Sequence, residues 1–402
     1  MWPVTMSHSV PLEGGITPYA RYRPLRLAAY GGFISIGMLA TVYGAILPPL
    51  GRDFSLNLAA LAGLFPPQAL AYGLATFVGG VVSDVIGRKR LYVGAALIMS
   101  LGMALAATAP GWPVLVAAAV LAGAGTGIVD SLTNALFLDL TVGEKGSAGA
   151  LNLLHTFFGV GALLAPLLAG FLLGHAISWR VIFAVLAVAS AALAAVALAT
   201  PFPPSHGEPA RLSDMVRLLT HPVFAMLGAV LALYVGGELV VTDWLVTYMV
   251  RAGLAPIEVA ASVLSFFWFT LMLGRLLGVW VAARIDPYWL TGGSAALSAI
   301  FLLATVTVPN FWACALFAGL TGLCYAVIFP TVFAIAGGVF PRYSGVLSGG
   351  LIVSTMGGSL LFPWLTGIIG QNAGLRVPFL AVAALTLLIV PLLVGVKRLA
   401  PR

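Results

Sequence analysis

The residue with the clearest chemical consequence is Asp130, an acid inside the apolar stretch 112–138. About 20 apolar residues in a helix, rising 1.5 Å each, cross the ~30 Å hydrocarbon core of a bilayer. A carboxylate at that depth costs about 3 kcal/mol on insertion scales, so an acid there is first interpreted as functional. Burial also disfavours the charged form of a carboxyl, which suits a group that must take up and release protons. The stretch predicts a membrane transporter that uses Asp130 for proton coupling.

A stripe of small and polar residues shares a helical face with this acid. Gly123, Gly127, Asp130 and Asn134 follow at steps of four, three and four. Small residues favour close packing of membrane helices, so we expect Asp130 to face protein and not lipid. The alternative is a purely structural acid bonded to a neighbouring helix. Asn134 is a candidate substrate-binding amide.

A second polar pair occupies the next apolar run, where Asn152 and His155 are one turn apart. Both could bind substrate hydroxyls, and His155 could also titrate near neutral pH. In an equally good interpretation, the two side chains satisfy each other's hydrogen bonds between helices.

In the seventh apolar run, Glu238 is the second candidate for proton coupling. Gly236 and Gly237 beside it should weaken the helix there. Asp243 lies about 140° further round the helix, nearer the outer surface, where water could solvate it. A structural bond from Glu238 to Arg275 or to backbone is an equally good alternative, and Arg275 is expected to snorkel or pair.

Aromatic residues are frequent in the same runs. They would pack on the C–H faces of a sugar, yet they would equally suit a hydrophobic drug or ordinary helix packing. The candidates for substrate binding are Tyr43, Trp244, Trp268, Tyr325 and Phe329.

Motifs for other chemistries are missing from the sequence. There is no Gly-x-x-x-x-Gly-Lys-Ser/Thr loop for ATP, no His/Cys cluster with metal spacing, and no nucleophile–base constellation in a soluble segment. We therefore expect no enzyme activity, no metal and no cofactor. A proton gradient is the expected driving force, with sodium as a further candidate.

The composition explains what must position these residues. Only 8% of the 402 residues are charged and 61% are hydrophobic, with a mean hydropathy of +1.08, whereas soluble domains carry about 25% charge. Twelve long apolar runs predict an all-α protein of twelve membrane helices, at roughly 27–50, 58–82, 91–109, 112–138, 148–173, 178–200, 222–250, 257–282, 288–308, 310–336, 344–369 and 374–395.

The formal charge of +7 has a topological explanation. With both termini inside, fourteen of the 19 basic residues fall on the inner side and four on the outer side. We expect a multi-pass protein of a bacterial inner membrane with cytoplasmic termini. Its partners are the lipid bilayer and a small-molecule substrate, the expected state is a monomer, and no nucleic acid is needed to explain the charge.

The chain also repeats itself. The segment 159–170, GVGALLAPLLAG, aligns with 356–367, MGGSLLFPWLTG, at an offset of 197. Two six-helix halves are a common transporter design. The expected organisation is a cytoplasmic tail (1–26), a first bundle (27–200), a linker (201–221) and a second bundle (222–402).

The segment 79–90, GGVVSDVIGRKR, resembles the signature of the major facilitator superfamily. Gly80 would allow close helix approach and Gly87 a tight turn. The resemblance implies a cytoplasmic gate that also contains Asp84, Arg88 and Lys89. The alternative is an ordinary basic loop on the inner side.

A closer resemblance is to the fucose permease-like branch, the fucose–galactose–glucose:proton symporters. It is carried by 123–140, GAGTGIVDSLTNALFLDL, and 151–166, LNLLHTFFGVGALLAP. It implies that Asp130 is the essential acid of the fourth helix, with Asn134 as its companion. The first span, 27–50, lacks the acid that the fucose permease itself carries there.

The sequence therefore predicts a major facilitator fold that imports a small polar solute, most simply a sugar, by proton symport and alternating access. The main alternative is a proton-driven exporter of drugs or metabolites. Such exporters carry Gly-Pro-x-x-Gly-Gly in the fifth span, and this chain has Ala165, Pro166, Ala169 and Gly170 at the matching positions. A nutrient receptor that does not transport is a third class.

Overall fold

The computed structural model describes residues 22–140, 147–203, 218, 220–341 and 344–400. Most of the predicted tail and linker lies outside these ranges, as do the side chains of Asp84 and Asn152. The predicted division into tail, bundles and linker therefore stays a prediction.

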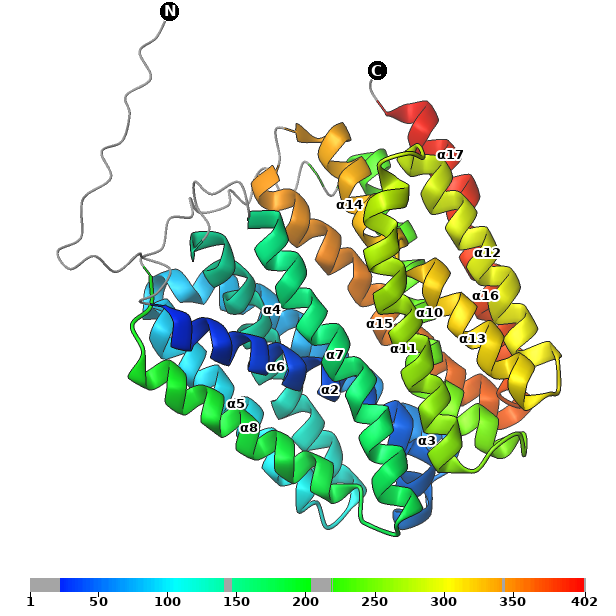
Figure 1. Ribbon diagram of the computed structural model, residues 1–402, viewed down its shortest axis with the longest axis horizontal. Helices are drawn as coiled ribbons and strands as arrows, with labels where there is room; N and C mark the ends of the chain where they lie inside the picture. The colour runs from blue at the N-terminus through cyan, green and yellow to red at the C-terminus, as the bar shows by residue number, and fades with distance from the viewer. Residues whose placement is uncertain (1–21, 141–146, 204–217, 219, 342–343, 401–402) are drawn as a thin grey trace, which may run out of the picture.

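The first half of the molecule, as we use the term, is the set of helices up to residue 199 (Figure 1). Its members are α2 (Arg23–Asp53), α3 (Leu58–Ala62), α4 (Phe65–Ile86), α5 (Arg88–Ala107), α6 (Trp112–Leu140), α7 (Ser147–Gly174) and α8 (Arg180–Ala199).

The second half contains the helices from residue 222 onward, coloured yellow-green to red in Figure 1. They are α10 (Pro222–Arg251), α11 (Ile257–Ala282), α12 (Pro287–Thr307), α13 (Phe311–Tyr325), α14 (Ile328–Val339), α15 (Ser344–Ala373), α16 (Arg376–Leu387) and α17 (Ile389–Leu399).

Within the described residues, twelve helical segments are long and apolar enough to cross a membrane, which confirms the predicted number of spans. Local chemistry sets their ends: Asp286 and Asn310 accept hydrogen bonds from the first backbone N–H groups of α12 and α13. The tenth span is split between α13 and α14, because Pro330 cannot donate to the carbonyl of Ala326 and its ring would clash with it. Sequence periodicity did not predict this break.

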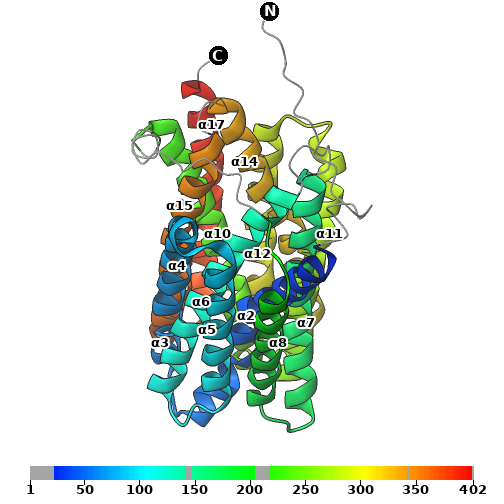
Figure 2. The ribbon, with the colours of Figure 1, turned by 90° about the vertical axis from the view of Figure 1, so that its left-hand side faces the viewer.

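Twelve crossings return the chain to the end of the bundle at which it began. We call the end where α2 starts and α17 finishes the terminal face, and the other end the opposite face (Figure 2).

Contacts between the halves occur toward the opposite face. The backbone N–H of Leu58 in α3 donates to Oε1 of Gln371 in α15 at 2.9 Å. Gly44 in α2 lies directly against α10, where a Cβ atom would come within 2.0 Å of the Thr242 carbonyl oxygen. The two halves are therefore packed together near the opposite face.

Gly236 and Gly237 do not interrupt their helix, because α10 continues through both residues. Whether they weaken it stays a prediction. They permit close packing, since a Cβ atom at Gly237 would lie 2.5 Å from the Tyr325 hydroxyl.

Candidate proton and substrate site

Asp130 lies on the face of α6 that packs against α4. A Cβ atom at Gly127 would come within 2.3 Å of the Tyr72 carbonyl oxygen, and one at Gly123 within 2.9 Å of the Gln68 carbonyl oxygen. Only glycine permits this approach. The predicted stripe is thus a helix–helix contact, and it brings Asp130 to the α4 interface.

Both carboxylate oxygens of Asp130 accept hydrogen bonds. The Tyr72 hydroxyl donates to Oδ2 at 2.5 Å, and Nδ2 of Asn134 donates to Oδ1 at 2.9 Å. The Asn134 amide also donates to the Asp130 backbone oxygen at 2.9 Å. An ionised carboxylate only accepts, so donors on both oxygens suit its charged form.

His155 on α7 extends this network. Its Nε2 lies 3.1 Å from Oδ1 of Asn134. Because an amide oxygen can only accept, Nε2 carries the hydrogen in this contact. The His155 side chain is exposed, whereas Asp130 and Asn134 are half-buried. The network therefore leads from an exposed imidazole to a sheltered carboxylate. The predicted pairing of His155 with Asn152 stays a prediction, because the Asn152 side chain is outside the described residues.

The second half presents another acid–tyrosine pair. The Tyr234 hydroxyl donates to Oε2 of Glu238, and the Thr242 hydroxyl donates to the Glu238 backbone oxygen at 2.8 Å. The ring of Tyr234 stands edge-on to Tyr325, with centroids 5.5 Å apart, and lies 6.3 Å from Phe329. Glu238 is therefore held beside an aromatic wall.

Arg275 on α11 is a cation near Glu238 and near His155. It interacts electrostatically with Glu238 and Tyr234 in its own half and with His155 in the first half. Its side chain is half-buried. Of the two roles expected for Arg275, the structure favours pairing.

Asp243 is the more buried of the two acids on α10, so the expectation that water solvates it is wrong. It is 5% exposed and has no hydrogen-bond partner within the described part of the chain. The close approach of α2 covers it, since a Cβ atom at Gly44 would lie 2.8 Å from the Asp243 Cα.

The five aromatic candidates separate into two groups. Tyr325 and Phe329 lie beside the Glu238 pair. Tyr43, Trp244 and Trp268 are almost completely buried, and the Trp244 indole donates to a backbone oxygen of α15. These three pack between helices in this conformation, and their role in substrate binding stays a prediction.

Part of the gate signature lies in the described residues. Gly87 has a φ of +90° and joins α4 to α5, so the predicted tight turn is confirmed. The close approach expected at Gly80 is wrong, because the nearest atom to a Cβ there would be 3.9 Å away. The tight contacts between α4 and α6 are made at Gly123 and Gly127 of α6 instead. Arg88 and Lys89 begin α5. The gate itself stays a prediction, because the Asp84 side chain is outside the described residues.

Two tyrosines were missed by the sequence analysis. Tyr234 precedes Glu238 by four residues, a spacing that brings side chains together on a helix and could have revealed it. Tyr72 has no local signal, because its partner Asp130 is 58 residues away.

Comparison with known proteins gives a consistent result. A family model described as Major Facilitator Superfamily matches residues 29–285 and 255–402. The chain is 26% identical over 366 residues to the uncharacterized MFS-type transporter YfkL of Bacillus subtilis, covering 86% of this chain and 89% of that protein. It is 25% identical over 370 residues to a glucose/galactose transporter of Brucella abortus, covering 87% and 88%.

Among solved structures, a bacterial homolog of the human lysosomal transporter Spinster, in an inward-facing and occupied conformation, superposes with a TM-score of 0.79. It is 18% identical, and the match covers 96% of this chain and 98% of that one. This likeness shows the fold.

Proposed function

This chain belongs to the major facilitator superfamily and is a multi-pass membrane transporter, and from that premise we propose that it imports a small polar solute, with a sugar as the expected class, by symport with protons. The observation that carries the proposal is the hydrogen-bonded chain from exposed His155 through Asn134 to Asp130. The match to a glucose/galactose transporter supports the sugar class.

The proton step follows from the donors around Asp130. In this conformation Tyr72 and Asn134 both donate to its carboxylate, an arrangement that stabilises the ionised form. Protonation of Oδ2 would make the carboxyl group donate to the Tyr72 oxygen, and protonation of Oδ1 would weaken the bond from the Asn134 amide, which can only donate. Loading of a proton therefore changes the hydrogen bonds of Asp130, which include the one that joins α6 to α4.

Substrate would bind between the hydrogen-bond network of Asp130 in the first half and the Glu238–Tyr234 pair in the second. Asn134, Asn152 and His155 can bond to hydroxyl groups from the first half, and Glu238 can do so from the second. Tyr325 and Phe329 present ring faces on which a sugar can pack. Glu238 is the second candidate for proton coupling, although Arg275 already compensates its charge.

We assign the terminal face to the cytoplasm, because fourteen of the 19 basic residues fall on that side. The contacts between halves near the opposite face then make this an inward-facing conformation. A fluorescent protein fused after Arg402 tests the assignment. Fluorescence of the fusion in intact cells supports it, and export of the fused domain contradicts it.

The substrate class can be tested by a thermal-shift screen on purified protein. A true ligand raises the melting temperature as its concentration exceeds its dissociation constant. Stabilisation by sugars supports the importer. Stabilisation by bulky lipophilic cations alone supports the exporter instead.

The coupling ion requires proteoliposomes with an imposed gradient. Uptake of the stabilising sugar should follow an inward proton gradient and should be unchanged when sodium is replaced by potassium. Uptake that needs a sodium gradient and ignores pH would replace the proton by sodium. Asp243→Asn is the matched control for Asp130→Asn, because it makes the same change in a membrane acid outside the network.

A further inference from the structure

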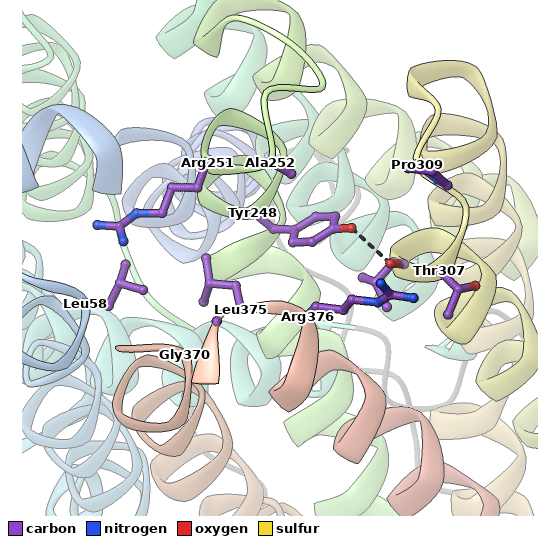
Figure 3. A pocket seen from close by; sticks show the side chains of 11 residues that line it. Leu58, Tyr248, Arg251, Ala252, Thr307, Pro309, Gly370, Leu375 and Arg376 are labelled. Atoms are coloured by element: carbon purple, nitrogen blue, oxygen red, sulfur yellow. Dashed lines mark hydrogen bonds between the residues drawn. The ribbon is translucent and has the colours of Figure 1, made fainter. Parts of the chain in front are cut away.

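A pocket of about 400 Å³ opens at the opposite face (Figure 3). Neither Asp130 nor Glu238 lines it. Its walls are the last turn of α10, the turn between α12 and α13, and the turn between α15 and α16, all in the second half. The remaining wall is Leu58 of α3, in the first half. The pocket thus lies across the boundary between the halves.

The charged groups that line this pocket are Arg251 and Arg376. Both side chains are exposed, and within the described part of the chain neither forms an ion pair with an acid. Arg180 on the same face differs, because its guanidinium lies 3.6 Å from the carboxylate of Asp53. The pocket therefore carries two positive charges for which the described residues provide no ion-pair partner.

The geometry spreads these charges along the pocket. In Figure 3 Arg251 points toward Leu58, and Arg376 points toward Thr307 at the other end. Between them the Tyr248 hydroxyl donates to the Val306 carbonyl at 3.1 Å, which fixes that wall.

The start of α16 adds a third positive feature. Its N-cap residue, Leu375, provides no side-chain acceptor for the first N–H groups of the helix. Such a helix N-terminus favours anions. Guanidinium groups bind phosphate and carboxylate oxygens through paired N–H donors.

We propose that this pocket binds a small phosphate-bearing anion, and that it does so only while the opposite face is closed. The restriction follows from the cross-half wall. Leu58 is held by the hydrogen bond from its N–H to Gln371. Separation of the halves at this face would break this bond and move Leu58 out of the pocket wall. A ligand that binds one of two conformations shifts the population toward that conformation. Anion binding from this side therefore slows transport by holding the carrier closed there.

The phosphate group could belong to a free solute or to a lipid headgroup, and the experiment separates these sources. Purified full-length protein is melted in inorganic phosphate and in chloride at equal ionic strength. At a tenfold excess over the dissociation constant, phosphate should raise the melting temperature by about 2 °C. A lipid headgroup as the source is tested by comparing the melting temperature in anionic phosphatidylglycerol vesicles with that in phosphatidylcholine vesicles.

The variant Arg251→Gln/Arg376→Gln should lose the shift while Arg52→Gln, a change on the same face outside the pocket, keeps it. The melting curve of each variant in chloride shows whether it is folded. If the double variant does not fold, the single variants Arg251→Gln and Arg376→Gln should each reduce the shift. The proposal is overturned if neither phosphate nor phosphatidylglycerol raises the melting temperature of the wild type. It is also overturned if the folded double variant keeps the shift.

The variant Gly44→Trp tests the conformational restriction. A side chain at Gly44 collides with α10 and prevents closure of the opposite face, so this variant should not respond to phosphate. A full response in Gly44→Trp would contradict state-selective binding. These readouts are binding measurements, so their failure would leave the proposed symport to be judged by its own uptake assays.

Discussion

The two halves of the molecule each hold an acid bonded to a tyrosine, yet the surroundings of the two acids differ. In the first half, Asp130 has neutral donors on both oxygens and a connection to exposed His155. In the second half, Glu238 sits beside an aromatic wall, and the charge that acts on it is that of Arg275.

This difference separates two uses of a membrane acid. A carboxylate stabilised by neutral donors can gain a proton without leaving a cation alone. A carboxylate paired with a cation cannot, because protonation would strip that cation of its partner. We therefore expect proton exchange at Asp130 and charge compensation at Glu238.

The largest expected effect is that of Asp130→Asn. One-to-one symport can hold about a tenfold solute gradient for each unit of pH difference. The variant should lose this accumulation in proteoliposomes while exchange of labelled for unlabelled solute continues. Glu238→Gln should still accumulate solute along the pH gradient. Equal loss of accumulation in both variants would remove the distinction between the two halves.

Arg275→Gln should have the next largest effect. It leaves Glu238 without its compensating charge, and uptake should fall about tenfold. Adding Glu238→Gln should restore part of that activity, because it removes the acid that Arg275→Gln leaves without a compensating charge. The two single variants and the double variant form a cycle, and strictly additive losses would show that the two residues are not coupled.

Tyr72→Phe and Tyr234→Phe compare the two hydroxyl donors. Loss of the Tyr72 donor destabilises the ionised carboxylate of Asp130, so half-maximal uptake should move to higher pH by about one unit. Tyr234→Phe should change the rate without moving this midpoint. A shift in Tyr234→Phe of the same size would assign proton exchange to Glu238 as well.

The smallest expected effect is on stability. Asp243 is buried without a hydrogen-bond partner in the described residues, and a neutral amide avoids the desolvation of a carboxylate. Asp243→Asn should therefore raise the melting temperature by about 1–2 °C at neutral pH. A fall would indicate that the carboxyl group makes a favourable contact.

Much of the fold was predictable, because membrane length and apolar composition are local properties. The twelve spans and the contact made by the stripe of Gly123 and Gly127 followed from residue spacing alone. The split of the tenth span was missed, since an apolar run conceals the effect of Pro330 on its helix.

The site was less accessible to sequence reasoning. Asp130 and Asn134 share a helix and could be paired from their spacing. The contacts of Asp130 with Tyr72 and of Asn134 with His155 join different helices, and only tertiary packing creates them. The burial of Asp243 has the same origin, because α2 covers it from the other half.

The most direct test of the account is the movement of protons caused by solute. A pH-sensitive dye inside proteoliposomes reports acidification when the transported sugar is added outside without an imposed gradient. The account predicts acidification with the wild type and with Glu238→Gln, and none with Asp130→Asn although that variant still exchanges sugar. Sugar-dependent acidification of equal size in Asp130→Asn would contradict it.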